Sequence, residues 1–349
     1  MQRRDLLQGA ALLGAGASLT PLAAAGHASD SSARPGAPFK LPYAPHFGMF
    51  KNHAGGDFVD QLNFMADEGF TALEDNGMMR KSVEDQNRIA QNMQRLGMRM
   101  GVFVCNFGTA FGKKSFVSGK KEFEDNFKSD LMKAVETAKR VNAKWMTVVL
   151  GDRHPGMRQG FQDARAIEML RRGAELLEPH DLVMVMEPLN FRDHAGMYLE
   201  RSDHAYMLAK AADSPAVKIL FDIYHQAISE GNLIPNIDLC WDEIGYFQIG
   251  DNPGRKEPTT GDVNYKNIFK HIHKRGWKGI LGMEHGNAGG GKEGERAVID
   301  WATTCGGRSG AVGGGRSFSF LLCCELFGGA GRRRRDMHVS FLPGGAVCG

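Results

Sequence analysis

Cysteine is scarce in this chain, and its cysteines are not spaced as a disulfide framework or a metal site. Six of the 349 residues are cysteine. Cys105 ends an apolar run and Cys240 lies in a helical pattern, so we expect both to be small buried hydrophobic residues. The other four lie at or beyond Cys305, without the spacing of zinc ligands. The sequence therefore predicts a functional site that does not use cysteine.

A strong net charge is also missing. The formal charge is +3, of which Arg3-Arg4-Asp5 contributes one and the segment after Cys305 contributes four. About −2 is left for the middle of the chain. Because such a balance provides no basic surface, we expect no nucleic-acid partner.

The N-terminus has a twin-arginine pattern, Arg3-Arg4-Asp5-Leu6-Leu7. A weakly apolar Gly/Ala-rich segment follows, with small residues up to Ala28, and it is too short and Gly-rich for a stable membrane span. We predict that residues 1–28 are a twin-arginine export signal and that the protein is periplasmic, or cytoplasmic if the signal is not used. Its partners would include the twin-arginine machinery, with no stable membrane association after processing.

The C-terminal segment 305–349 has no hydrophobic periodicity. It contains runs of glycine and the arginines Arg332 to Arg335. Such a composition cannot bury one consistent face, so we expect an irregular or disordered tail. The segment is more like an out-of-frame translation of GC-rich DNA than an evolved domain.

Between residues 41 and 304, short apolar runs alternate with longer amphipathic ones. The pattern at 121–140 is helical. The apolar runs are continuous rather than alternating, as is typical of parallel strands buried on both faces. Eight strand–helix units predict an α/β fold, a single-domain (β/α)8 TIM barrel. A doubly wound sheet is the alternative, but no Gly-rich phosphate turn follows the first strand. The expected strands are 45–50, 71–75, 99–106, 144–150, 182–187, 217–223, 246–250 and 279–284.

Four consecutive strands each end in a residue with a side-chain oxygen: Glu187, Asp222, Gln248 and Glu284. In a parallel barrel the carboxyl ends of the strands meet at one rim, so these side chains should converge. Three carboxylates so close repel one another unless a cation lies between them. Oxygen ligands without cysteine favour Mg²⁺ or Mn²⁺ over Zn²⁺.

A metal held in this way suits proton transfer between neighbouring carbons of a small hydroxy-oxo compound. Glu187 and Glu284 are suitably separated to be the acid/base pair, and all four residues are predicted metal ligands. His225 could donate a hydrogen bond to a substrate oxygen, or it could be an ordinary loop histidine. Arg255 could bind the far end of the substrate, or it could be a surface charge.

The segments around these residues resemble the hydroxypyruvate isomerase family of xylose isomerase-like TIM barrels. The similarity is carried by Glu187-Pro188-Leu189-Asn190, by Asp222-Ile223-Tyr224-His225 and by the run from Gln248 to Arg255. The resemblance implies the acid/base and ligand roles given above, with His225, Arg255, Asp251 and Asp193 contacting substrate. Asp193 could equally pair with Arg192. The segment Leu73-Glu74-Asp75-Asn76-Gly77 departs from the family pattern.

The resemblance implies a metal-dependent isomerase that interconverts hydroxypyruvate and 2-hydroxy-3-oxopropanoate (tartronate semialdehyde). The alternatives are a ketose 3-epimerase, or another sugar or cyclitol isomerase or dehydratase of the same superfamily. A different class, a non-catalytic periplasmic sugar-binding protein, would not need two opposed glutamates. The partner is a small hydroxy-oxo acid or sugar, and the sequence leaves the formation of a homo-oligomer open.

Overall fold

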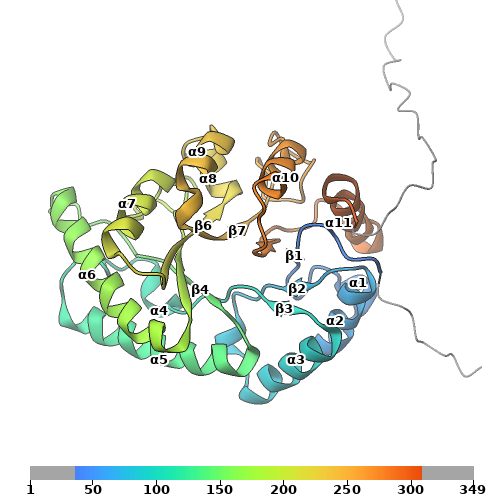
Figure 1. The fold of residues 1–349 in the computed structure, drawn as a ribbon, viewed down its shortest axis with the longest axis horizontal. Coiled ribbons are helices and arrows are strands. Elements are labelled where there is room, and N and C mark those ends of the chain that lie inside the picture. Colours follow the sequence, from blue (N-terminus) through green and yellow to red (C-terminus); the bar gives the residue numbers. More distant parts are fainter. Residues whose placement is uncertain (1–35, 309–349) are drawn as a thin grey trace, which may run out of the picture. The chain divides into compact units, whose positions relative to one another are not determined.

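The computed structural model describes residues 36–308. The predicted export signal and the segment from residue 309 onward lie outside the described residues. Strands alternate with helices along the described chain, and the helices surround the strands (Figure 1).

The strands are β1 (Tyr43–Ala44), β2 (Ala72–Leu73), β3 (Arg99–Met100), β4 (Trp145–Val148), β5 (Val183–Met186), β6 (Val217–Asp222), β7 (Ile244–Gln248) and β8 (Leu281–Gly282). The α-helices are α1 (Lys51–Ala54), α2 (Phe58–Asp67), α3 (Val83–Leu96), α4 (Phe107–Ala110), α5 (Lys121–Val141), α6 (Gln159–Leu177), α7 (Ser202–Ala212), α8 (Ile223–Ser229), α9 (Leu233–Cys240), α10 (Tyr265–Lys274) and α11 (Gly291–Gly306). Three short 3₁₀ helices are Met78–Arg80, Glu178–His180 and Trp241–Glu243.

The strands form two parallel sheets that are joined at both ends. One sheet has the order β1-β8-β7-β6-β5-β4 and the other contains β2 and β3. A parallel bridge between His46 and Glu74 links β1 to the β2 segment, and a bridge between Met100 and Ala143 links β3 to the β4 segment. The strands therefore follow one another around a ring in chain order, which confirms the predicted TIM-barrel fold.

Seven of the eight expected strands overlap the observed ones, but the strand expected at 45–50 is wrong. The first strand is Tyr43–Ala44, and a turn follows it. Gly48 has a φ of 94°, in the left-handed region that an extended chain does not use. The apolar side chains of Met49 and Phe50 are buried in the core from this turn rather than from a strand.

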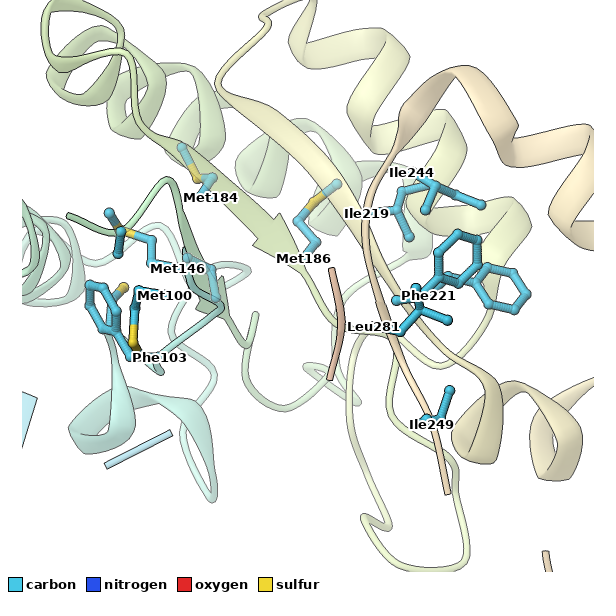
Figure 2. Close-up of a cluster of buried hydrophobic side chains, with 14 of the residues drawn as sticks. Met100, Phe103, Met146, Met184, Met186, Ile219, Phe221, Ile244, Ile249 and Leu281 are labelled. Atoms are coloured by element: carbon cyan, nitrogen blue, oxygen red, sulfur yellow. The ribbon is translucent and has the colours of Figure 1, made fainter. Parts of the chain in front are cut away.

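Side chains along each strand alternate between two apolar clusters. Met184 and Met186 of β5 point outward to the large core between strands and helices, part of which is shown in Figure 2. Val185, between them, belongs to a smaller cluster in the barrel interior with Leu220 and Tyr246. This alternation is the two-residue period of a β-strand, and it decides which residues beyond each strand end face the barrel axis.

The helices follow the amphipathic pattern of the sequence. The helix expected at 121–140 is confirmed as α5, which buries Phe127 and Leu131. Cys105 and Cys240 are buried, as expected. Among the helices of residues 36–308, none has both the length and the apolar character needed to cross a membrane.

Candidate active site

On three strands, β5, β6 and β7, the side chains that face the barrel interior are followed by polar side chains at the carboxyl end. Two residues beyond the inward Val185 of β5 comes Glu187. In the same way Asp222 lies two residues beyond Leu220 of β6, and Gln248 lies two residues beyond Tyr246 of β7. Asp222 and Gln248 are paired across these two strands. The predicted ligands on these three strands therefore face the barrel axis because the strand period is two.

A compact acidic group lies at the end of β5 and β6. Single ligand atoms of Glu187, Asp222 and His225 all lie within 4.8 Å of one another. Asp222 is 1% exposed and Glu187 is 7% exposed. Asp222 also caps α8, because its Oδ1 accepts the backbone N–H of Tyr224 at 2.8 Å.

Arg255 connects Glu284 to this group. Its Nη2 donates to Asp222 Oδ2 at 2.8 Å and to Glu284 Oε2 at 2.7 Å. Its Nε donates to the backbone carbonyl of Glu284 at 3.0 Å. The guanidinium lies 4.8 Å from the ring centre of Tyr224, so its position is held from two sides. The structure thus brings Arg255, Asp222 and Glu284 into direct contact.

Gln248 is held by Glu74, an acidic residue that was not among the predicted site residues. Its Nε2 donates to Glu74 Oε1 at 2.8 Å. Within residues 36–308, the buried Oε1 of Gln248 has no hydrogen-bond partner. A buried amide oxygen without a donor is uncommon unless a cation or an ordered water binds it.

The hydrogen bonds of Asn190 fix the tautomer of His225. Asn190 Oδ1 accepts the backbone N–H groups of Arg192 and Asp193, at 3.0 and 2.9 Å. Its Nδ2 therefore faces the ring and donates to His225 Nδ1 at 2.7 Å. With Nδ1 as acceptor, the proton of the neutral ring is on Nε2, which lies 3.4 Å from Asp222 Oδ2. In this tautomer His225 presents an N–H group to the site, and its buried Nε2 has no hydrogen-bond partner among the described residues.

Burial and mutual repulsion perturb the titration of this group. Burial raises the pKa of Glu187 well above its usual value, and the charges of Glu284 and Asp222 add to the rise. Burial also raises the pKa of Asp222 and of Glu284, although Arg255 opposes both rises. Burial and then Arg255 lower the pKa of His225, which keeps the ring neutral. One guanidinium does not neutralise three carboxylates, and a divalent cation would remove the remaining repulsion.

The residues present fit a hard divalent cation. Glu187, Asp222 and Glu284 supply carboxylate oxygens, and Gln248 supplies the unpartnered amide oxygen. Mg²⁺ and Mn²⁺ prefer such donors.

Two predicted substrate contacts have other partners. Asp193 is exposed, and its Oδ2 accepts from Tyr224 Oη at 2.7 Å and from Asn190 Nδ2 at 3.0 Å, so it supports the walls of the site. No ion pair joins it to Arg192 among the described residues. Asp251 is fully buried, and its role as a substrate contact stays a prediction. Its carboxylate accepts four backbone N–H groups of the loop that carries Arg255, those of Asn252, Thr259, Gly261 and Val263.

Sequence reasoning missed Glu74, Asn76 and Asn190. Asn76 Nδ2 donates to Glu284 Oε1 at 2.7 Å. The signal for Glu74 was its place two residues after Ala72, which faces the barrel interior. A strand of two residues makes that period hard to recognise.

The ring of strands carries its acidic group at the carboxyl ends, where TIM barrels hold their active sites. A family model described as "Xylose isomerase-like TIM barrel" matches residues 62–305. The chain belongs to this family.

Curated relatives with a similar sequence are isomerases. The hydroxypyruvate isomerase of Escherichia coli K12 is 32% identical over 162 residues, which are 46% of this chain and 63% of that enzyme. The match therefore spans somewhat less than two thirds of the relative. The 2-oxo-tetronate isomerase of Pectobacterium atrosepticum is 26% identical over 70% of this chain and 91% of the relative. A solved structure of an AP endonuclease of family 2 from Brucella melitensis is similar in fold, with a TM-score of 0.65, 23% identity and coverage of 75% of this chain and 99% of that one.

Proposed function

We propose that the protein is a divalent-metal-dependent isomerase that interconverts hydroxypyruvate and 2-hydroxy-3-oxopropanoate. The observation that carries the proposal is the acidic rim of four adjacent strands: Glu187 and Asp222 lie in one compact group, Arg255 joins Asp222 to Glu284, and Gln248, paired with Asp222 across β6 and β7, has an unpartnered oxygen. The names of the two relatives support an isomerase that acts on a small hydroxy-oxo acid.

Glu187, Asp222, Gln248 and Glu284 would hold Mg²⁺ or Mn²⁺. When bound, such a cation polarises the substrate carbonyl and stabilises the negative charge of an enediolate.

The two glutamates transfer the carbon-bound protons in this proposal. One removes a proton from C3 of hydroxypyruvate, the carbon that bears the hydroxyl group, and the other delivers a proton to C2. The hydroxyl proton moves from the C3 oxygen to the C2 oxygen, so the product has the same composition as the substrate. A carboxyl whose pKa is raised by burial is better suited to this task at neutral pH than an ordinary glutamate.

His225 and Arg255 position the substrate. The Nε2–H of His225 faces the carboxylate group and can donate to the substrate oxygen on which charge develops. Arg255 presents a guanidinium at the same place, and its side chain is 27% exposed. We assign it to the substrate carboxylate, which planar guanidinium groups bind well.

A four-carbon acid is the second candidate substrate. The specific observation in its favour is the match to 91% of the length of the 2-oxo-tetronate isomerase.

The test is proton exchange with solvent. The Mn²⁺-loaded protein is incubated in D₂O with hydroxypyruvate, with 2-oxo-tetronate and with free ketoses, and deuterium at each carbon is followed by NMR. Glu284→Gln is the matched control, since it keeps the size of the side chain and removes the base. We expect deuterium at C3 of hydroxypyruvate and at C2 of 2-hydroxy-3-oxopropanoate. Exchange only in the ketoses would favour an epimerase, and no exchange in any compound would favour a non-catalytic binding protein.

We also propose that residues 1–28 direct export to the periplasm through the twin-arginine pathway. A change of Arg3 and Arg4 to lysine should leave the protein in the cytoplasmic fraction. Equal fractionation of both forms would refute export by this route.

A further inference from the structure

Glu74 is a buried acidic residue that the proposed reaction does not use. It follows β2, and its side chain reaches β7, where it contacts Tyr246 and Gln248. It is 2% exposed. Its Oε2 accepts from Tyr246 Oη at 2.9 Å, and its Oε1 accepts from Gln248 Nε2 at 2.8 Å. Both carboxylate oxygens are thus bound to side chains of one strand.

Two glycines make room for this polar group. A Cβ on Gly282 of β8 would lie 1.7 Å from Glu74 Oε2. A Cβ on Gly101, directly after β3, would lie 2.3 Å from Tyr246 Oη. The rest of the interior cluster is apolar, with Ala72, Val102 and Leu220 among its members. An apolar side chain at position 74 would pack there without the cost of burying a carboxyl, so the acidic residue calls for a role beyond packing.

The hydrogen bond to Glu74 fixes the orientation of the Gln248 side-chain amide. The two ends differ, since Nε2 only donates and Oε1 only accepts. Because Glu74 accepts a hydrogen bond from Gln248 Nε2, the amide oxygen Oε1 of Gln248 faces away from Glu74. This oxygen is buried and has no hydrogen-bond partner among the described residues. A flipped amide would place an N–H group where a cation needs an oxygen.

We propose that Glu74 is a positioning residue that holds the Gln248 amide so that its Oε1 is available to the divalent cation. The inference rests on the proposed function, because it assumes that a cation binds at this rim. Residues that orient metal ligands in this way typically change metal affinity about 10- to 100-fold when they are removed.

The experiment measures Mn²⁺ affinity by calorimetry, together with the electron paramagnetic resonance spectrum of the bound ion. Glu74→Met removes the acceptor, and Gly282→Ala displaces it while leaving Glu74 in the sequence. We expect both variants to bind Mn²⁺ roughly 10- to 100-fold more weakly, with an altered spectrum. Tyr246→Phe is the matched control, because it also removes one hydrogen bond to Glu74 but leaves Gln248 oriented, and its affinity should stay within about twofold.

A swap of the two polar side chains separates positioning from folding. The double variant Glu74→Gln, Gln248→Glu reverses donor and acceptor and keeps the hydrogen bond and the net charge, with the carboxylate now at position 248. It should restore the affinity to within about threefold of the wild type. This variant remains decisive if Glu74→Met does not fold.

The outcomes are distinct. Wild-type binding together with unchanged affinity in Glu74→Met and Gly282→Ala would overturn the role of Glu74 alone. Loss of affinity in the swap variant as well would also overturn it, since a positioning role predicts rescue. A wild-type protein that binds neither Mn²⁺ nor Mg²⁺ would overturn the proposed function and the inference with it.

Discussion

Asp222→Asn tests whether the carboxylates at the rim repel one another and require a cation. The asparagine keeps the oxygen that caps α8 and removes one negative charge next to Glu187. Two unit charges 4.8 Å apart repel by roughly 3.5 kcal/mol at an effective dielectric constant of 20. Against this stands the loss of the hydrogen bond from Arg255 to Asp222 Oδ2, which is worth about 1.5–3 kcal/mol.

The relief of repulsion therefore slightly exceeds the loss of the hydrogen bond. At pH 8 without metal, we expect the free energy of unfolding to rise by roughly 0–2 kcal/mol. If Asp222 and Arg255 were instead a buried ion pair without excess negative charge around it, the substitution would lower the free energy of unfolding by about 3–5 kcal/mol. Mn²⁺ at 100 times its dissociation constant should stabilise the wild type by about 2.7 kcal/mol, and the variant by less than about 1 kcal/mol.

The pH dependence has a definite sign. Burial raises the pKa of Asp222 and Glu187 in the folded state, so the metal-free protein loses stability as pH rises from the unfolded values near about 4 through the raised ones. The difference in the free energy of unfolding between Asp222→Asn and the wild type should be largest at pH 8 and should vanish near pH 4. Urea unfolding with EDTA or Mn²⁺ measures these quantities. Two results would refute the reasoning: a free energy of unfolding more than about 3 kcal/mol lower in the variant at pH 8, or the same stabilisation by Mn²⁺ in the variant and the wild type.

Three further predictions concern single residues. Glu284→Gln should lower deuterium exchange at least about 100-fold while the protein remains folded by circular dichroism, and retained exchange would remove Glu284 from the mechanism. Asp251→Ala leaves four backbone N–H groups without their acceptor and should lower the free energy of unfolding by roughly 2–3 kcal/mol and raise KM, because Arg255 is on the same loop. An unchanged unfolding curve would contradict the loop role. In ¹⁵N NMR spectra at pH 7, His225 should show a protonated Nε2, and Asn190→Ala should weaken that preference; a proton on Nδ1 in the wild type would contradict the assigned hydrogen bonds.

The barrel and the four candidate ligands could be predicted because the relevant signals are local. Each ligand follows an apolar run directly, and parallel strands bring their carboxyl ends together in any barrel. The first strand could not be located in the same way. Phe47, Met49 and Phe50 give residues 45–50 the composition of a strand, but Gly48 bends the chain, and the side chains become buried from a turn.

The remaining details of the site depend on contacts between distant segments. Nothing in the sequence distinguishes a carboxylate that accepts loop N–H groups, as Asp251 does, from one that faces a substrate. The tautomer of His225 depends on Asn190, 35 positions away in the sequence. Glu74 meets Gln248 across 174 positions, so only the closed ring shows that they are partners.

The strands of the barrel differ in how they are hydrogen-bonded to their neighbours. From β4 through β8 to β1 the pairing is continuous, whereas β2 and β3 form a separate ribbon attached at its two edges by isolated bridges. The four candidate ligands belong to segments of the continuous part, and Glu74 and Asn76 belong to the ribbon. A small outward movement of the ribbon would release Gln248 and Glu284 from their partners without moving the backbone that carries them. The candidate ligands and the two residues that hold their side chains thus belong to differently paired parts of the barrel.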